Sequence, residues 1–300
     1  MTCENGAVHL TKHEGAGNDF LVVLDPDDNL RLSGDQVRLL CHRHRGVGAD
    51  GVIRVGRGGG GGAGAAGAAG GADLTMQLHN ADGGEAEMSG NGIRCLAQAA
   101  VDAGWVTPPT FSVATAGGVR TVTFLPGEEP GWARASVDMG AVTVGPAQEE
   151  IDGRTARTAD VGNPHLVLVG PGLAGAAGVA GAAGVAGVDI GTRGPQLQAA
   201  YPDGINVEWI ELAHDADGDF LELRVWERGA GETLACGTGS VAAAAVARAV
   251  NLVGGSGPVR VHNPGGMLEV TLGRGADAPA VLAGPVRKVA DIELHPGMLS

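Results

Sequence analysis

The sequence predicts an α+β fold made of two pseudo-symmetric domains, each a mainly antiparallel sheet or barrel wrapped around a central helix. Three observations lead to this class: an internal repeat, short β-rich runs, and one small apolar segment after a glycine motif in each half. We expect the domains to cover residues 1–131 and 132–300, with the last strand free to return to the first domain. They would join near the proline- and glycine-rich stretch 125–132.

The internal repeat has an offset of about 147 residues. It sets Gly90 over Gly237 and Ser89 over Cys236, so that the motifs SGNG and CGTG stand in equivalent places. Because several pairs occur in the same order, we interpret the two halves as homologous. The further pairs are Gly92 with Gly239, Asn80 with Glu227 and, at slightly different offsets, Asn18 with Asn163.

The secondary-structure signals agree with two similar halves. Short runs rich in β-branched and aromatic residues indicate a mostly antiparallel sheet. The clearest are FLVVL (20–24), VTFL (122–125), NVEWIEL (206–212) and FLELRVW (220–226). Each glycine motif is followed by a segment that is small and apolar nearly all round, residues 93–104 and 240–250. A helix of that kind is typically buried, so each sheet should enclose one.

The bulk composition is typical of a globular protein and excludes some partners. The chain has 300 residues, 44% hydrophobic and 18% charged, enough to build a core in each domain. A formal net charge of -14 argues against nucleic acid and anionic membranes as partners. Two Gly/Ala-rich inserts, 56–73 and 170–187, are interpreted as flexible surface segments because they bury too little side chain to offset their ordering entropy.

The cysteines indicate neither a zinc site nor a disulfide framework. The four cysteines are irregularly spaced and form no C-x-x-C pair. The first residues lack a basic region followed by an apolar run, so we expect no signal peptide and a cytoplasmic protein with reduced thiols. A homodimer is left open, because no feature of the sequence reports the oligomeric state.

The two glycine motifs can support acid–base chemistry on an anionic substrate. A helix N-terminus carries about half a positive charge, and Gly90-Asn91 and Gly237-Thr238 would let a carboxylate approach the backbone closely. The same field is expected to lower the pKa of Cys236 from about 8.5 towards neutrality. Pseudo-symmetry would set Ser89, the equivalent residue of the other half, across from it.

Two acid/base groups on opposite faces of one carbon can invert the α-carbon of an amino acid. One group removes the α-proton and the other delivers a proton from the far side. The usual alternative is pyridoxal phosphate, which needs a lysine for its Schiff base. The chain has only Lys12 and Lys288, near its two ends and in no recognisable motif. The sequence therefore favours a cofactor-free reaction.

Six motifs, in order along the chain, resemble those of the diaminopimelate epimerase family of lysine and peptidoglycan-precursor synthesis. They are KHEGAGNDF (12–20), HRGVGADG (44–51), NADGGEAEMSGNGIRC (80–95), GNPH (162–165), INVEWI (205–210) and ERGAGETLACGTGS (227–240). The resemblance implies the fold predicted above, a small-molecule substrate, and no cofactor or metal. It also implies two-base epimerisation of LL-diaminopimelate to meso-diaminopimelate.

The resemblance further implies roles for the matched residues. Cys236 would be one acid/base group, and His165 and Glu227 would tune the thiol pKa. The remaining matched residues would bind substrate. At the reacting carboxylate they are Gly90, Asn91, Gly237 and Thr238; elsewhere they are Asn18, Asn80, Asn163, Asn206, Glu227 and Arg228.

Two positions depart from the family pattern. Gly51 stands where the family often has glutamine, so one binding contact would be absent. Ser89 stands where the family has its second catalytic cysteine, and a hydroxyl has a pKa closer to that of water, about 15.7, than to that of a thiol. Three explanations stay open: an altered but active Ser89/Cys236 pair, a different chemistry, or an engineered substitution. The functional alternatives are a related amino-acid isomerase or hydroxyproline epimerase or dehydratase, and a catalytically silent amino-acid-binding paralogue.

Overall fold

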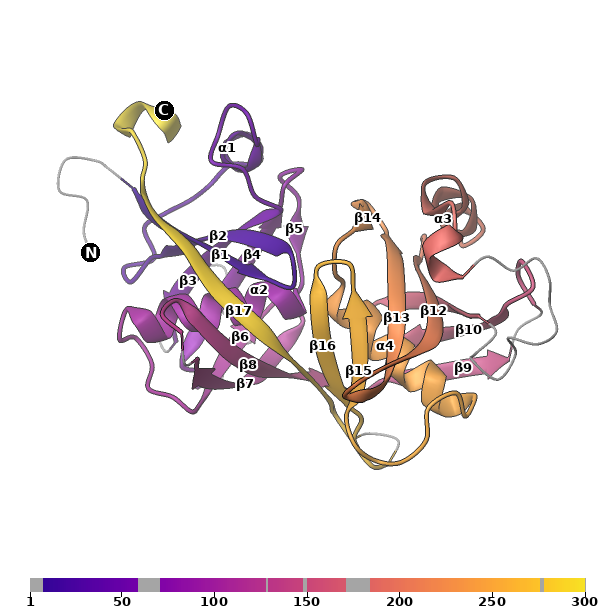
Figure 1. The fold of residues 1–300 in the computed structure, drawn as a ribbon. Helices are drawn as coiled ribbons and strands as arrows, with labels where there is room; N and C mark the ends of the chain where they lie inside the picture. Colours follow the sequence, from indigo (N-terminus) through magenta and orange to yellow (C-terminus); the bar gives the residue numbers. More distant parts are fainter. Residues whose placement is uncertain are drawn as a thin grey trace. The chain divides into compact units, whose positions relative to one another are not determined.

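The computed structural model describes residues 8–58, 71–127, 129–147, 150–170, 184–275 and 278–299 (Figure 1). The chain divides into two compact units, Met1–Val137 with Pro285–Ser300 and Asp138–Gly284. The expected domains 1–131 and 132–300 stay a prediction. Most of each Gly/Ala-rich insert lies outside the described residues. Within those residues no helix is both long and apolar enough to cross a membrane.

The first unit is a barrel of eight strands within the described part of the chain. Around the barrel the order is β17, β1, β2, β3, β4, β6, β7 and β8, and β8 pairs again with β17. Pairing is mainly antiparallel, but β2–β3 and β4–β6 are parallel. The bounds are β1 His9–Gly15, β2 Asn18–Leu24, β3 Gly51–Arg57, β4 Leu74–Asn80, β6 Thr110–Thr115, β7 Gly118–Pro126, β8 Trp132–Gly140 and β17 Ala280–Glu293.

The first barrel encloses helix α2 (Gly90–Asp102), which Figure 1 shows among the strands of this unit. Its residues from Gly90 to Ala100 are all buried, and it contacts β1, β2, β3, β4 and β7. Helix α1 (Gly34–Cys41) begins at Ser33 with a reciprocal capping box to Gln36. The short elements β5 (Glu85–Ala86) and η4 (Pro296–Leu299) complete the unit.

The second unit has the same organisation around helix α4 (Gly237–Ala249), which contacts the strands from β9 to β13 as well as β15 and β16. The pairs β11–β12 and β13–β15 are parallel and the others are antiparallel. The strands are β9 Thr143–Ala147, β10 Thr155–Asp160, β11 Pro164–Val169, β12 Asn206–Asp215, β13 Gly218–Glu227, β14 Gly231–Thr233, β15 Val259–Asn263 and β16 Gly266–Thr271, with the first residues of β17. The other helices are η3 Val185–Gly187 and α3 Ile190–Ala199.

The internal repeat is confirmed by the order of the elements. The series β1, β2, α1, β3, β4, β5, α2, β6, β7, β8 corresponds to β10, β11, α3, β12, β13, β14, α4, β15, β16, β17, and the parallel pairs fall in the same places. Each central helix has 13 residues. Both helices begin at the glycine motif, at Gly90 and Gly237, three residues before the apolar segments, because the motif itself forms the first turn.

Small side chains allow each barrel to close around its helix. In α4 the four alanines from Ala242 to Ala245 are buried, so the surrounding strands can pack close to the helix axis. Alternate residues of β13 are buried on the side of the strand that packs against α4. They are Leu221, Leu223 and Val225. Burying such a side chain contributes about 1.5–3 kcal/mol. The packing fixes the helix, and with it the glycine motif at the helix N-terminus.

Candidate active site

The glycine motif of the first unit forms the first turn of α2, and Ser89 is the N-cap. Ser89 has an extended backbone (φ −137°, ψ 123°), and its Oγ accepts a hydrogen bond from the backbone N–H of Gly92 at 3.0 Å. Gly90 and Asn91 are buried in the first turn. A helix N-terminus of this kind favours an anionic ligand.

Cys236 caps α4 in the same way. Its backbone is extended (φ −122°, ψ 119°), and its Sγ accepts a hydrogen bond from the Gly239 N–H at 3.3 Å. The Thr238 hydroxyl lies 3.5 Å from the same sulfur. Ser89 and Cys236 therefore occupy equivalent positions in the two units.

Cys236 is buried beside two carboxylates, Glu227 and Glu208. Burial raises the pKa of the thiol well above its usual value, and the negative charges of Glu227 and Glu208 raise it further. Hydrogen bonds from Thr238 and Gly239 lower it without outweighing these effects. The expectation that the helix N-terminus brings this pKa towards neutrality is therefore wrong, because desolvation and like charge are the larger effects here.

Glu227 is placed to exchange a proton with Cys236. Burial raises the pKa of Glu227, while hydrogen bonds from the Thr233 hydroxyl and the Cys236 thiol lower it by less. A carboxylate with a raised pKa is a better proton acceptor than an ordinary one. The Cys236 thiol lies within hydrogen-bonding reach of this carboxylate.

A chain of hydrogen bonds leads from Glu208 to Cys236. Glu208 Oε1 lies 2.7 Å from His165 Nδ1, and neither side chain is exposed to solvent. His165 Nε2 lies 3.0 Å from Asn163 Oδ1, and the Asn163 amide donates to Thr238 Oγ1 at 3.4 Å. Thr238 contacts Cys236 as described above. The structure thus connects His165 and Asn163, two predicted site residues, to the sulfur.

Glu208 was missed by sequence reasoning. It lies in the motif INVEWI on β12, where the first five residues of the strand are all buried. A single acidic residue in a buried apolar strand is costly unless it has a partner. That conflict was the available signal, and it points to a functional role.

Asn206 and Arg228 lie at the neighbouring strand ends. The Asn206 amide donates to the Pro164 carbonyl at 3.2 Å, and its Oδ1 accepts from the Arg228 backbone N–H at 2.8 Å. Arg228 is exposed and donates to the Asp203 carbonyl at 2.9 Å. Asn206 thereby ties the end of β13 to β11, next to Glu227.

In the first unit, Asn18 and Asn91 form a network with a buried arginine. Asn91 Nδ2 donates to Asn18 Oδ1 at 3.4 Å, and Asn18 Nδ2 donates to Asp50 at 2.7 Å. The fully buried Arg94 donates to Asn91 Oδ1 at 3.0 Å and to the Gly90 carbonyl at 2.9 Å. Burial lowers the pKa of Arg94 to about 10, so it remains charged at neutral pH. Its positive charge adds to the anion preference of the α2 N-terminus.

Asn80 and Gly51 are opposite each other on β4 and β3. Asn80 is exposed at the end of its strand. A Cβ at Gly51 would lie 2.6 Å from the His79 carbonyl oxygen, so a larger residue would require the backbone to shift. The glycine at this position is therefore built into the local strand geometry.

The surroundings of Ser89 and Cys236 differ in charge although the strand register around them corresponds. His165 is paired with Asn206 on β12, and Glu208 follows two residues later. The same register in the first unit pairs Phe20 with Gly51, and Ile53 follows two residues later. The histidine and glutamate behind Cys236 thus correspond to a phenylalanine and an isoleucine behind Ser89.

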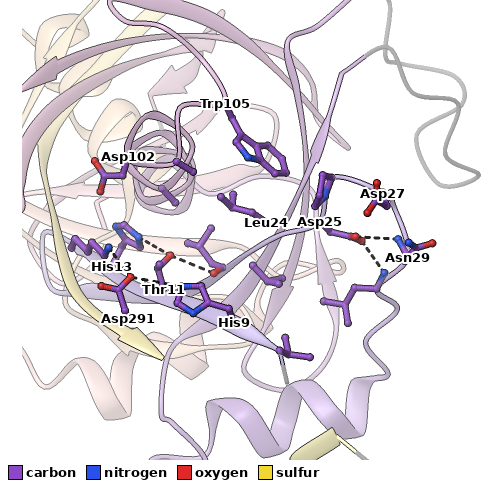
Figure 2. A pocket seen from close by; sticks show the side chains of 18 residues that line it. His9, Thr11, His13, Leu24, Asp25, Asp27, Asn29, Asp102, Trp105 and Asp291 are labelled. Atoms are coloured by element: carbon purple, nitrogen blue, oxygen red, sulfur yellow. Dashed lines mark hydrogen bonds and ion pairs between the residues drawn. The ribbon is translucent and has the colours of Figure 1, made fainter. Parts of the chain in front are cut away.

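A pocket of about 800 Å³ lies in the first unit, away from the glycine motif (Figure 2). It is lined by Asp102 and Trp105 at the far end of α2 and by Thr11 and His13 of β1. Burial lowers the pKa of His13 to about 4, so this imidazole is neutral. None of the predicted site residues lines this pocket. Within the described ranges no cluster of three His, Cys, Asp or Glu side chains could hold a metal ion.

Comparisons with known sequences agree with one another. A family model described as diaminopimelate epimerase matches residues 10–145 and 157–289. The diaminopimelate epimerase of Corynebacterium glutamicum is 37% identical over 290 residues, which cover 95% of this chain and 98% of that protein. The diaminopimelate epimerase of Mycobacterium tuberculosis is 40% identical over 288 residues, which cover 93% and 94%.

Solved structures confirm the fold. A hydroxyproline epimerase from Agrobacterium vitis matches with a TM-score of 0.66 at 14% identity, covering 98% of this chain and 94% of that one. A PhzF-family phenazine biosynthesis protein from Bacillus anthracis matches with a TM-score of 0.69 at 15% identity, covering 96% and 99%. At these identities the likeness concerns the fold alone.

Proposed function

Because the chain belongs to the diaminopimelate epimerase family, we propose that it interconverts LL-diaminopimelate and meso-diaminopimelate, an isomerase reaction of lysine biosynthesis. The reaction would move a proton at the α-carbon without pyridoxal phosphate or another cofactor. One observation carries the proposal: Ser89 and Cys236 cap equivalent 13-residue helices with the same side-chain hydrogen bond. Two equivalent residues with exchangeable protons suit a reaction that removes one proton and supplies another.

In this proposal Cys236 is the base that removes the α-proton. Its thiol proton passes to Glu227, whose raised pKa favours the transfer. The thiolate left behind is stabilised by the Gly239 N–H and the Thr238 hydroxyl. Taking the α-proton returns Cys236 to the thiol and leaves negative charge on the substrate, next to its carboxylate.

The glycine motifs would hold that carboxylate. Backbone N–H groups at a helix N-terminus stabilise negative charge that develops during reaction, and removal of one such donor typically costs 10²–10³ in rate. The buried charge of Arg94 strengthens this preference in the first unit. The residues assigned to the carboxylate are Gly90, Asn91, Gly237 and Thr238.

Ser89 would deliver the proton to the opposite face of the α-carbon. Its hydroxyl can donate to a carbanion, but removing an α-proton would require an alkoxide. Deprotonating a hydroxyl with a pKa near 15.7 costs about 10 kcal/mol more than deprotonating a thiol with a pKa near 8.5. The step at Ser89 should therefore limit epimerisation in both directions.

The remaining assigned residues would bind the rest of the substrate. Diaminopimelate has a second amino-carboxylate end, which calls for several polar side chains beyond the reacting centre. Support comes from the polar strand ends that surround Glu227 and Asn18 in the two units. The proposed set is Asn18, Asn80, Asn163, Asn206, Glu227 and Arg228.

Ser89 favours a second candidate within the same chemistry. A Ser/Cys pair could serve a related isomerase, such as a hydroxyproline epimerase or dehydratase. A third candidate, a silent amino-acid-binding paralogue, would bind without proton exchange. The first two candidates differ in which amino acid exchanges its α-proton, and the third exchanges none.

The deciding experiment is incubation of the purified protein in deuterated water with LL- and meso-diaminopimelate, proline and 4-hydroxyproline. Nuclear magnetic resonance follows α-deuterium incorporation, and Cys236→Ala is the control. We expect exchange only with diaminopimelate and none with the control. Exchange with 4-hydroxyproline alone would replace the first candidate by the second, and binding without exchange would favour the third.

The proposal includes a cytoplasmic location. The few, unpaired cysteines support a reducing compartment, since those within the described residues are all free thiols. The homodimer that the sequence left open stays a prediction, and analytical ultracentrifugation of the purified protein tests it.

A further inference from the structure

Glu208 is the feature of the second unit that the proposed reaction leaves without a role. Neither its side chain nor that of His165 is exposed to solvent. Its Oε1 is bonded to His165, while its Oε2 has no hydrogen-bond partner among the described residues. A buried carboxylate with an unsatisfied oxygen is costly, so its retention needs an explanation.

We infer that Glu208 is a positioning residue that sets the direction of the hydrogen-bond chain ending at Cys236, and so favours the thiolate. The chain runs from Glu208 through His165, Asn163 and Thr238 to the sulfur. The inference extends the proposed function, because a base at Cys236 must exist as thiolate. It does not depend on the identity of the substrate.

The direction follows from what each group can donate. Glu208 as a carboxylate can only accept, so His165 Nδ1 must donate to it. At the other ring nitrogen, Asn163 presents its oxygen, which also only accepts, so Nε2 must donate as well. The Asn163 amide then donates to Thr238, whose hydroxyl is left to donate to Cys236. From His165 Nε2 onwards, every hydrogen in the chain points towards the sulfur.

This arrangement requires both nitrogens of His165 to carry hydrogen. The imidazolium and the Glu208 carboxylate then form a buried pair with no net charge, as buried charges require. If a neutral amide replaced the Glu208 carboxylate, His165 could lose one proton, and Nδ1 would keep its hydrogen and donate to the amide oxygen. The chain could then reverse: His165 Nε2 would accept from a flipped Asn163 amide, the Asn163 oxygen from the Thr238 hydroxyl, and Thr238 from the thiol. A reversed chain stabilises the thiol rather than the thiolate.

The local packing is adapted to this carboxylate. A Cβ at Gly239 would lie 2.8 Å from Glu208 Oε1, so the first turn of α4 leaves room for it. The equivalent Gly92 faces Ile53 instead, at 3.0 Å. The barrel can therefore fill this position with an apolar side chain, and the carboxylate is not needed to build the fold.

The inference predicts the sign of a measurable change. The titratable groups that face one another here are Glu208 on β12, His165 on β11, Glu227 on β13 and Cys236 at the start of α4. If Glu208 acted only through its own negative charge, its removal would lower the pKa of Cys236 and speed its alkylation. If it acts through His165, Glu208→Gln removes the directing carboxylate and the imidazolium together, and alkylation slows.

The test is the rate of Cys236 alkylation by iodoacetamide between pH 6 and 10, followed by peptide mass spectrometry. We expect Glu208→Gln to react about tenfold more slowly at pH 7.5, which corresponds to about one unit of thiol pKa. His165→Gln should slow the reaction to the same extent, and the double variant no further, because the two residues act as one unit. No substrate is used, so failure here is distinct from failure of the proposed function.

Glu222→Gln is the matched control, because Glu222 forms a partly exposed pair with His262 at 2.9 Å that has no link to Cys236. Its alkylation rate should equal that of the wild type. An unchanged or faster rate in Glu208→Gln would overturn the inference. Should that variant fold poorly, nitrogen-15 spectra of histidine-labelled wild type decide: two protonated ring nitrogens at His165 support the inference, and a neutral ring overturns it.

Discussion

Replacing Ser89 by cysteine should raise the rate of epimerisation by a factor of about 10² to 10⁴, the usual contribution of a positioned general acid or base. The change should be tolerated, because Cys236 already occupies the equivalent backbone position with a sulfur. The N-cap torsions differ by little, φ −137° and ψ 123° at Ser89 against φ −122° and ψ 119° at Cys236. The Cβ sites of Gly92 and Gly239 also lie 3.2 Å from the Cβ of their respective caps.

The size of the effect comes from the cost of forming the base. A pKa difference of about seven between an alkoxide and a thiolate corresponds to about 10 kcal/mol. That figure is an upper bound, because burial and nearby carboxylates raise the pKa of a thiol in this fold, as at Cys236. Both directions should gain by the same factor in kcat/KM, since the equilibrium constant belongs to the substrates.

The assay is deuterium incorporation into LL- and meso-diaminopimelate, measured separately by nuclear magnetic resonance before equilibrium is reached. In the wild type, the isomer whose α-hydrogen is removed by Cys236 should exchange quickly and the other slowly. In Ser89→Cys the slow exchange should become fast. Ser89→Ala is the control and should lose epimerisation while keeping the fast exchange.

The reasoning would be refuted by equal exchange into both isomers that Ser89→Cys leaves unchanged. It would be refuted equally if Ser89→Ala epimerised as fast as the wild type. Either result would mean that another group supplies the second proton.

Three further substitutions test the site and the fold. Cys236→Ala should abolish turnover but keep substrate binding, as kinetics and calorimetry would show; activity above a few per cent would remove Cys236 from the mechanism. Gly239→Ala should destabilise the fold by about 1–3 kcal/mol in urea denaturation, because its Cβ would lie 2.8 Å from Glu208, whereas Gly254→Ala, with nothing within 4 Å, should be neutral. Asp25→Asn should destabilise the protein at pH 7 and much less at pH 3. Burial raises the pKa of Asp25, but hydrogen bonds from an arginine and two backbone N–H groups lower it by more. The contribution of the ionised Asp25 to stability is therefore lost as the pH falls. A pH-independent difference in stability would contradict the last expectation.

The positions of Ser89 and Cys236 could be predicted because they depend on local sequence. A glycine motif followed by a small apolar segment determines where a buried helix begins, and the repeat made the two motifs equivalent. Each helix begins at its glycine motif, as predicted, and the glycines form the first turn. Helix α3 was missed because it contains two internal glycines and Pro195, which are poor helix formers.

The role of Glu208 and the pKa of Cys236 depend on distant contacts. The pairing of β11 with β12 brings Glu208 to His165, and no local pattern reports that register. The helix N-terminus lowers the pKa of Cys236, as the sequence predicts, but burial and two carboxylates raise this pKa by more. Burial of Cys236 comes from the fold around it, and the two carboxylates, Glu227 and Glu208, are 9 and 28 positions away in the chain.

The apolar pair Phe20 and Ile53 shows that this type of barrel also folds with apolar residues at the positions of His165 and Glu208. Replacing a buried ion pair by hydrophobic residues of similar volume is often neutral or stabilising, by up to about 4 kcal/mol. The first barrel already holds such a pair in the matching register, and it closes around its helix in the same way. A protein not selected for turnover could therefore replace His165 and Glu208 by apolar residues in two substitutions and gain stability. In the proposal made above, His165 and Glu208 serve the reactivity of Cys236 rather than the stability of the barrel.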